Sequence, residues 1–104
     1  MKASDITQKA TDLVGGDRGR THGDKRENHQ NIAALWNAYL GHRLVGGLTP
    51  LDAALMMALL KIARTKCGSH NPDDYVDLAG YAGVAGEIAD GDETLRRAVA
   101  PPAC

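Results

Sequence analysis

The sequence contains no phenylalanine and has only four aromatic residues, one tryptophan and three tyrosines. A core built almost without large rings relies on Leu, Ala, Ile, Val and Met side chains, which suits closely packed helices. Hydrophobic residues make up 43% of the 104 residues, enough for one small globular domain and too many for a disordered chain. We expect a single helical domain over residues 1–104, with its core in residues 15–89, a tail at residues 100–104, and homo-oligomerisation to complete a small core.

Long apolar runs and an excess of charge of one sign are also absent. No segment approaches the roughly 18 consecutive apolar residues of a membrane helix, and the polar first residues do not resemble a secretory signal. The formal net charge of −1 gives no general attraction to nucleic acid or to a membrane surface. We therefore expect a cytoplasmic protein with no membrane partner and no DNA partner.

Cysteine is scarce, and the common catalytic motifs are missing. Cys67 and Cys104 stand alone, without a Cys-x-x-Cys pair or histidines at zinc spacing, so we expect two reduced thiols with no assigned role. The sequence has no P-loop, no Gly-x-Ser-x-Gly elbow, no His-Glu-x-x-His motif and no dinucleotide fingerprint. These absences exclude the P-loop nucleotidases and give no support to hydrolase-fold, zincin or Rossmann chemistry.

The residues that are present predict helices and no strands, because no segment alternates apolar and polar side chains. Ser4, Thr49 and Asn71 are expected N-caps, and Pro50 and Pro72 occupy the favoured first helical position. The helices are expected at residues 4–14, 24–40, 49–66 and 71–89, followed by a turn at residues 90–93 and a short helix through residue 99. This pattern predicts an all-α bundle of four to five helices.

Three helical faces are expected to be buried. The run of apolar residues 53–60 predicts that the third helix is central, with neighbours on most sides. The small residues at 79–86 of the fourth helix would allow another helix, of this chain or of a second subunit, to approach closely. The second helix is expected to present an apolar face made of Ile32, Leu35, Trp36, Tyr39 and Leu40.

Most acidic residues fit the capping box, in which an N-cap residue and an acidic residue three positions later bond each other's backbone amides. The three pairs with this spacing are Asp24 with Glu27, Thr49 with Asp52, and Asn71 with Asp74. Asp73, second in its helix, also lies near the positive end of the helix dipole. Capping therefore explains these carboxylates as readily as metal binding does.

Asp77 is the carboxylate that neither capping nor the helix dipole explains. It lies beyond the first turn and heads an apolar stripe that continues through Tyr81, Val84 and Ile88. A carboxylate on a packed face requires protonation, a cationic side chain or a metal ion. Asp73 lies one turn before it, so these two could share Mg²⁺.

Lys61 and Arg64 lie three residues apart near the end of the third helix. Cations favour a helix C-terminus, and their long stems cover apolar surface, so solvation alone can explain them. Lys61, however, follows an almost unbroken apolar run and should emerge where the third helix meets the fourth. There it would either neutralise Asp77 or hold a phosphate group.

The glycine-rich segment at residues 15–24 is a third candidate. It carries Arg18, Arg20 and His22 into the start of the second helix, where backbone amides and arginines together favour anionic oxygen. Asn28 and His29 follow at the start of that helix. A polar pair there is expected more often as a hydrogen-bonded core feature than as a set of ligands.

Several segments together resemble a family of short phage and prophage proteins of unassigned function. The resemblance covers roughly residues 15–89 and depends on the combination of its parts. His22 stands where that family has a tyrosine, and Asp74 stands where it has a serine. The segments are Arg20-Thr-His-Gly-Asp24, Glu27-Asn28, residues 32–36, residues 52–64, and residues 73–81.

That family is in turn distantly similar to the all-α, MazG-like nucleoside triphosphate pyrophosphohydrolases. Those enzymes hold Mg²⁺ with a Glu-x-x-Glu on one helix facing a Glu-x-x-Asp on the next, and act generally as oligomers. Here Lys61-x-x-Arg64 stands in the first position and Asp74-x-x-Asp77 in the second, with Glu27 as a further ligand from another helix. The resemblance implies a MazG-like fold, but two cations in place of two ligands favour at most one Mg²⁺, or a site that binds nucleotide phosphates without cutting them.

The first functional hypothesis is a Mg²⁺-dependent nucleotide pyrophosphohydrolase in the cytoplasm of a bacterial host. Metal would bind Asp77, Asp73, Asp74 and Glu27, and Lys61 and Arg64 would stabilise charge on the phosphates. Arg18, Arg20, Asn28 and Tyr81 would bind the nucleotide or another phosphate-bearing small molecule. The alternatives are a non-catalytic helical protein that sequesters a nucleotide, a signalling molecule or a host protein, and a structural bundle in which Asp77 pairs with Lys61 or Arg64.

Overall fold

The computed structural model describes residues 1–16 and 25–99, and this part of the chain is helical without any strand. The predicted all-α class is therefore confirmed. Arg18, Arg20, His22 and Asp24 lie outside the described residues. The elements are α1 (Ala3–Gly15), α3 (Lys25–Leu40), the 3-10 helix η1 (Gly41–Arg43), α4 (Pro50–Arg64) and α5 (Pro72–Val99).

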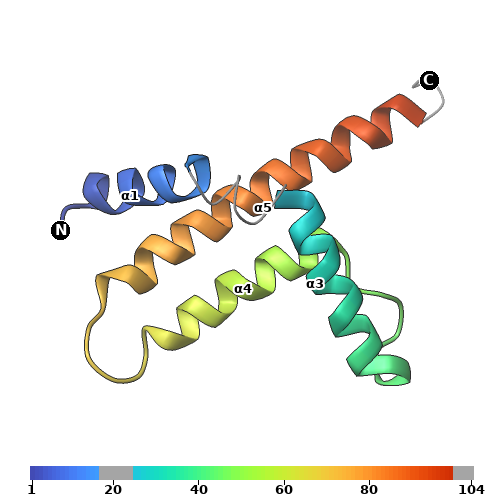
Figure 1. Cartoon of the computed structure of the whole chain (residues 1–104), viewed down its shortest axis with the longest axis horizontal. Coiled ribbons are helices and arrows are strands. Elements are labelled where there is room, and N and C mark those ends of the chain that lie inside the picture. The colour runs from blue at the N-terminus through green and yellow to red at the C-terminus, as the bar shows by residue number, and fades with distance from the viewer. Residues whose placement is uncertain (17–24, 100–104) are drawn as a thin grey trace.

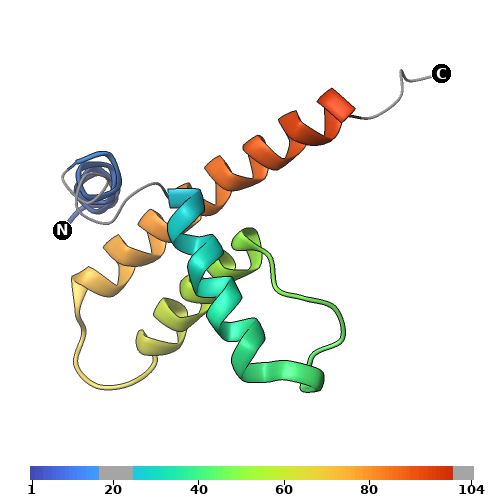
Figure 2. The ribbon, with the colours of Figure 1, turned by 45° about the vertical axis from the view of Figure 1, so that its right-hand side comes forward.

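Helix α5 contacts each of the other three described α-helices, which pack on it (Figure 1). Helix α4 runs back along α5, and α1 lies on another side of it with no helix of the described part but α5 as a neighbour. Helix α3 crosses both α4 and α5, as the turned view shows (Figure 2). None of the described helices combines the length and apolar character needed to cross a bilayer.

The predicted start of α4 is confirmed, because Thr49 and Asp52 form a complete capping box. Thr49 Oγ1 accepts the Asp52 amide at 3.1 Å, and Asp52 Oδ2 accepts the Thr49 amide at 2.9 Å. At the start of α5 the Asn71 side chain accepts instead from the Asp73 amide, at 3.1 Å. The box predicted between Asn71 and Asp74 is therefore wrong.

The start of α1 also differs from the prediction. The helix begins at Ala3, so Lys2 rather than Ser4 occupies the N-cap position. The Lys2 amide donates to Asp5 Oδ2 at 2.9 Å, which satisfies one of the amide groups that the first turn leaves open. Ser4 lacked the acidic residue three positions later that completes a capping box, whereas Lys2 has Asp5 at that spacing.

Helix α5 continues through the predicted turn at residues 90–93, so that turn and the separate short helix are wrong. Arg26 of α3 donates to the Ile88 carbonyl at 3.1 Å and to the Asp92 carboxylate, and it lies directly over Gly91. This contact with another helix outweighs the local preference of an Asp-Gly-Asp sequence for a turn. Further along, hydrogen bonds from Arg96 and Arg97 lower the pKa of Glu93 and support the last turns.

The core is built from small side chains. Ala54, Val84, Ala85 and Ile88 form its central cluster at the α4–α5 contact, with Val14 and Leu51 packed against it. No large side chain of the described residues is completely buried. Small residues let the helix backbones approach closely, but they bury little apolar surface in each copy of the chain.

Two predicted apolar faces are only partly buried. Leu35 and Tyr39 of α3 are 71% and 77% exposed, because α3 packs through His29, Ala33 and neighbouring residues on its other side. Helix α4 is not central: its alanines are buried, while large residues on its outer side are exposed. A run of apolar residues shows that polar side chains are absent from that stretch. It does not show how many sides of the helix are covered by other helices.

The small residues of α5 are only partly explained. A Cβ at Gly80 would lie 3.5 Å from Val14, so α1 supplies a close neighbour from the same chain. Gly83 and Gly86 face open space, where an added Cβ would meet nothing within 4 Å. The close approach of another helix is therefore confirmed at Gly80 alone among these three glycines.

The segment before α4 is fixed by Asn37 of α3. Its side-chain amide donates to the Leu48 carbonyl at 3.1 Å, and its side-chain oxygen accepts the Leu48 amide at 2.7 Å. Two hydrogen bonds to one residue hold the chain in register as it enters the Thr49 cap. Asn37 thereby sets where α4 begins relative to α3.

Replacing Gly86 with alanine should stabilise the protein. Alanine restricts the unfolded chain and favours the helix, so the free energy of unfolding should rise by about 1 kcal/mol. Urea denaturation followed by circular dichroism at one protein concentration measures the change. Gly46→Ala is the matched control, because the φ of +76° at Gly46 is unfavourable for alanine and stability should fall. A loss of stability in Gly86→Ala would contradict the open environment of this glycine.

Candidate functional site

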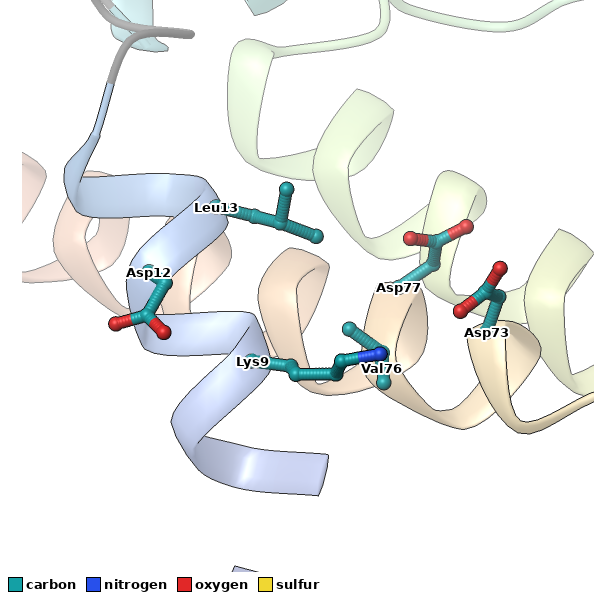
Figure 3. A pocket seen from close by; sticks show the side chains of 6 residues that line it. All are labelled: Lys9, Asp12, Leu13, Asp73, Val76 and Asp77. Carbon is teal, nitrogen blue, oxygen red and sulfur yellow. The ribbon is translucent and has the colours of Figure 1, made fainter. Parts of the chain in front are cut away.

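An open pocket of about 530 Å³ lies between α1 and the first turns of α5. In Figure 3 the carboxylates of Asp73 and Asp77 project to the same side of α5, and Lys9 extends from α1 across the space between the two helices. The lining residues are Lys9, Asp12 and Leu13 of α1 together with Asp73, Val76 and Asp77 of α5.

Asp77 makes an ion pair with Lys61 across the α4–α5 contact. Lys61 Nζ lies 2.9 Å from Asp77 Oδ2, and the two side chains are only 12% and 27% exposed. Partial burial reduces the screening by water, so this pair interacts more strongly than an exposed one. The sequence left open whether Asp77 is protonated, paired with a cationic side chain or bound to a metal ion. The geometry is that of pairing with Lys61.

Arg64 does not share this role. It is exposed on α4, and it has no ion pair with any carboxylate in the described part of the chain. Arg64 lies three positions after Lys61, and that spacing turns it away from the α5-facing side of the helix by roughly 60°. Lys61 is therefore the one of the two predicted cations that reaches the pocket region.

The four predicted metal ligands are not brought together. Asp73 and Asp77 line one pocket, whereas Asp74 is absent from its lining and Glu27 lies in the first turn of α3. Within residues 1–16 and 25–99, no group of three or more His, Cys, Asp or Glu side chains is arranged to hold a metal ion. Mg²⁺ normally requires one or two carboxylates together with waters and substrate phosphates. Magnesium binding stays a prediction.

The predicted substrate-binding residues also separate. Asn28 is exposed on α3, so the expectation of a core feature is wrong for this residue. Tyr81 is half-buried and faces α3, where its ring meets the His29 ring edge-on at 6.3 Å between centroids. Neither residue lines the pocket.

Sequence reasoning missed the basic residues that attach α3 to α5. Arg26 binds Ile88 and Asp92, and Lys25 Nζ lies 3.5 Å from a Glu87 carboxylate oxygen. These contacts span more than 60 positions of sequence, so no local spacing indicates them. Only the placement of two basic residues at the start of α3, where a helix dipole disfavours them, could have suggested that they have partners elsewhere.

His29 is the one buried polar side chain of the described residues. Its Nδ1 lies 2.8 Å from the Lys25 carbonyl, which holds Nδ1 as the protonated nitrogen. Its Nε2 is buried without a hydrogen-bond partner and lies beside the aromatic ring of Tyr81. The expectation that this position is a core feature is confirmed for His29.

The charges around the pocket favour a basic ligand group. Three of the six lining residues are aspartates, and one is a lysine. Lys61 compensates Asp77, and Asp12 accepts a hydrogen bond from the uncharged amide of Gln8 at 2.9 Å. The charge that remains on Asp12 and Asp73 exceeds that of Lys9, so a bare phosphate would be repelled and an ammonium or guanidinium group attracted.

Replacing Lys61 with methionine should destabilise the protein by about 1–2 kcal/mol, because Asp77 then remains half-buried without its cation. Urea denaturation of Lys61→Met, Asp77→Asn and the double variant gives the interaction energy of the pair. We expect the double variant to lose less than the sum of the single variants, by about 1 kcal/mol. Arg64→Met on the same helix is the matched control and should change stability by less than about 0.5 kcal/mol. Additive single effects would contradict the pairing.

Comparison with known proteins identifies relatives but no activity. No solved structure matches the chain, so the predicted similarity to the MazG-like enzymes stays a prediction. The chain is 46% identical over 79 residues to the Gene 55 protein of Mycobacterium phage L5, a match covering 76% of the chain and 49% of that relative. It is 37% identical over 83 residues to the Gene 55 protein of Mycobacterium phage D29, covering 80% of the chain and 52% of that relative.

The chain therefore spans about half the length of the curated relatives that it matches. The model of a family described as Domain of unknown function (DUF6378) matches residues 5–89, which include α3, α4 and most of α1 and α5. The predicted resemblance to phage proteins of unassigned function is confirmed by these matches. The chain belongs to the DUF6378 family, whose function is unknown.

Proposed function

We propose that this protein is a non-catalytic helical binding protein. The observation that carries the proposal is the Lys61–Asp77 ion pair, which engages an oxygen of the carboxylate best placed to hold a catalytic metal. A metal ion would have to displace the Lys61 ammonium or share the carboxylate with it, and two cations at one carboxylate repel each other. A protein that binds a ligand without catalysis needs no metal ion at Asp77, so the ion pair can stay intact.

The ligand group that fits the pocket between α1 and α5 is basic. Asp12 and Asp73 line it from opposite helices, and Leu13 and Val76 provide apolar contacts for an alkyl stem. A lysine or arginine side chain combines an apolar stem with a charged end. Among the ligands considered for a binding protein, a protein partner that presents such a side chain therefore fits better than a free nucleotide.

A Mg²⁺-dependent nucleotide pyrophosphohydrolase is the second candidate function. It is favoured by one observation, that Asp73 and Asp77 lie one turn apart and line the same pocket. In that mechanism the two carboxylates would hold the metal, a metal-activated water would attack a phosphate, and Lys61 would move from Asp77 to the phosphate. This candidate requires a rearrangement that the binding function does not.

The two functions are separated by a pyrophosphate-release assay with a panel of NTPs and dNTPs in the presence of Mg²⁺. We expect no release by the wild-type protein above the level of Asp77→Asn. Lys61→Met is the informative second variant, because it keeps the carboxylate and removes the competing cation. Mg²⁺-dependent release by the wild type that disappears in Asp77→Asn would overturn the proposal in favour of the enzyme, and a further loss of release in Lys61→Met would assign Lys61 to the phosphate.

Ligand binding is measured separately by NMR, following backbone amide signals while a short peptide rich in Lys and Arg is added. We expect the signals of Leu13, Val76 and Asp77 to shift, and Asp73→Asn to weaken the effect several-fold because one pocket carboxylate is lost. The same peptide with acetylated lysines and citrullines is the control and should cause little change. Shifts at these residues with Mg²⁺ and ATP but not with the peptide would contradict a basic ligand.

A further inference from the structure

Helix α4 buries its small side chains and exposes its large ones. Ala53, Ala54 and Ala58 are at most 9% exposed on the inner side of the helix. The outer side carries five large apolar residues: Leu55 is 47% exposed, Met56 38%, Leu59 62%, Leu60 47% and Ile62 40%. We call these five residues the outer α4 face.

The outer α4 face is unusual for a surface in contact with water. A surface helix normally places polar and charged side chains opposite its buried stripe. From residue 53 to residue 60, α4 has no polar side chain at all. The exposed fractions of the five residues correspond to on the order of 400 Å² on a single helix, within the range of the largest apolar patches of whole monomeric proteins, which are often functional.

We infer that the outer α4 face is covered by the same face of a second copy of this chain, with the two α4 helices antiparallel about a two-fold axis. The charges at the ends of the helix favour this occupant. Asp52 lies at the N-terminal end of α4, and Arg64 and Lys66 lie at its C-terminal end. Antiparallel pairing puts the acidic end of one helix beside the basic end of the other, twice, by symmetry.

The size of the face fits a two-fold contact. Two copies of the five side chains bury on the order of 800 Å² together, which is about two-thirds of the roughly 1,200 Å² at the lower limit of stable interfaces. Ala63, the flanking polar residues and the helix backbone border the five side chains and add to that area. The pairing would also complete the core, because none of the described residues has a large side chain that is fully buried within one copy.

Another exposed apolar pair provides the control surface. Leu95 and Val99 lie near the end of α5 and are 60% and 83% exposed. They repeat the helical phase of Val84 and Ile88, so they continue the inner stripe of α5 beyond the part that other helices cover. Leu95 matches Leu59 in residue type and exposure, but it lies on a different helix.

Sedimentation equilibrium of the full chain tests the inference, with the wild type expected at twice the 11.0 kDa chain mass. Leu59→Lys should weaken the dimer at least about 100-fold, because it buries a charge between two apolar faces. Its far-UV circular dichroism should match the wild type, since Leu59 is already exposed within one chain. Leu95→Lys, the matched control, should leave the dimer intact. A monomeric wild type at about 100 μM, or a dimer that Leu95→Lys disrupts and Leu59→Lys does not, would overturn the inference.

Cross-linking tests the antiparallel arrangement. Leu59 lies midway between Asp52 and Lys66, so the two-fold axis should pass close to it and bring two copies of residue 59 together. In a chain carrying Cys67→Ser and Cys104→Ser, Leu59→Cys should give a disulfide-linked dimer under mild oxidation, and Leu95→Cys should not. Efficient linkage at residue 95 with none at residue 59 would place the contact on α5 and overturn the inference. Because these readouts do not involve nucleotide or the α1–α5 pocket, their outcome is independent of the proposed function.

Discussion

The close contact between α4 and α5 is the constraint on which the rest of the structure depends. Alanine on α4 meets Val84, Ala85 and Ile88 on α5, and these small and medium side chains let the two helices run side by side. That contact brings Lys61 against Asp77 at one end. The same contact turns the large residues of α4 outward. The core cluster and the outer α4 face therefore both follow from the small side chains on the inner side of α4.

The Lys61–Asp77 pair explains how a carboxylate can occupy the packed side of a helix. Both side chains are more than two-thirds buried, and each supplies the charge that the other requires there. The pair also affects the charge of the pocket, because Lys61 compensates Asp77 and leaves Asp73 and Asp12 as the pocket's uncompensated aspartates. Helix α1 contributes Asp12 but packs on α5 alone among the described helices, so the pocket depends on the described α-helix with the fewest neighbouring helices.

The sequence predicted the helices well where the signals are local. Thr49-Pro50 and Asn71-Pro72 marked the starts of α4 and α5 because capping and proline geometry act within a few residues. The predicted turn at residues 90–93 failed because Arg26, far away in sequence, holds that stretch in the helix. The burial of α4 was overestimated because hydrophobicity alone does not distinguish a face covered by the same chain from one left uncovered.

The candidate site could be predicted only in part, for the same reason. Asp77 was singled out because it heads an apolar stripe and Lys61 because it follows an apolar run, and the two side chains do meet. Lys9 and Asp12 could not be singled out, since the exposed side of α1 carries other charged and polar residues with the same local pattern. Their place beside Asp73 follows from how α1 packs on α5, and a helical period does not specify the partner of a helix.

The central proposal is that Lys61, and not a metal ion, is the partner of Asp77. Electron paramagnetic resonance of Mn²⁺, used in place of Mg²⁺, tests it directly by counting free metal while wild-type protein, Asp77→Asn and Lys61→Met are added in turn. The account predicts no binding tighter than about 1 mM by the wild type, the range of weak and unspecific carboxylate sites. Stoichiometric Mn²⁺ binding by the wild type that is lost in Asp77→Asn would contradict it.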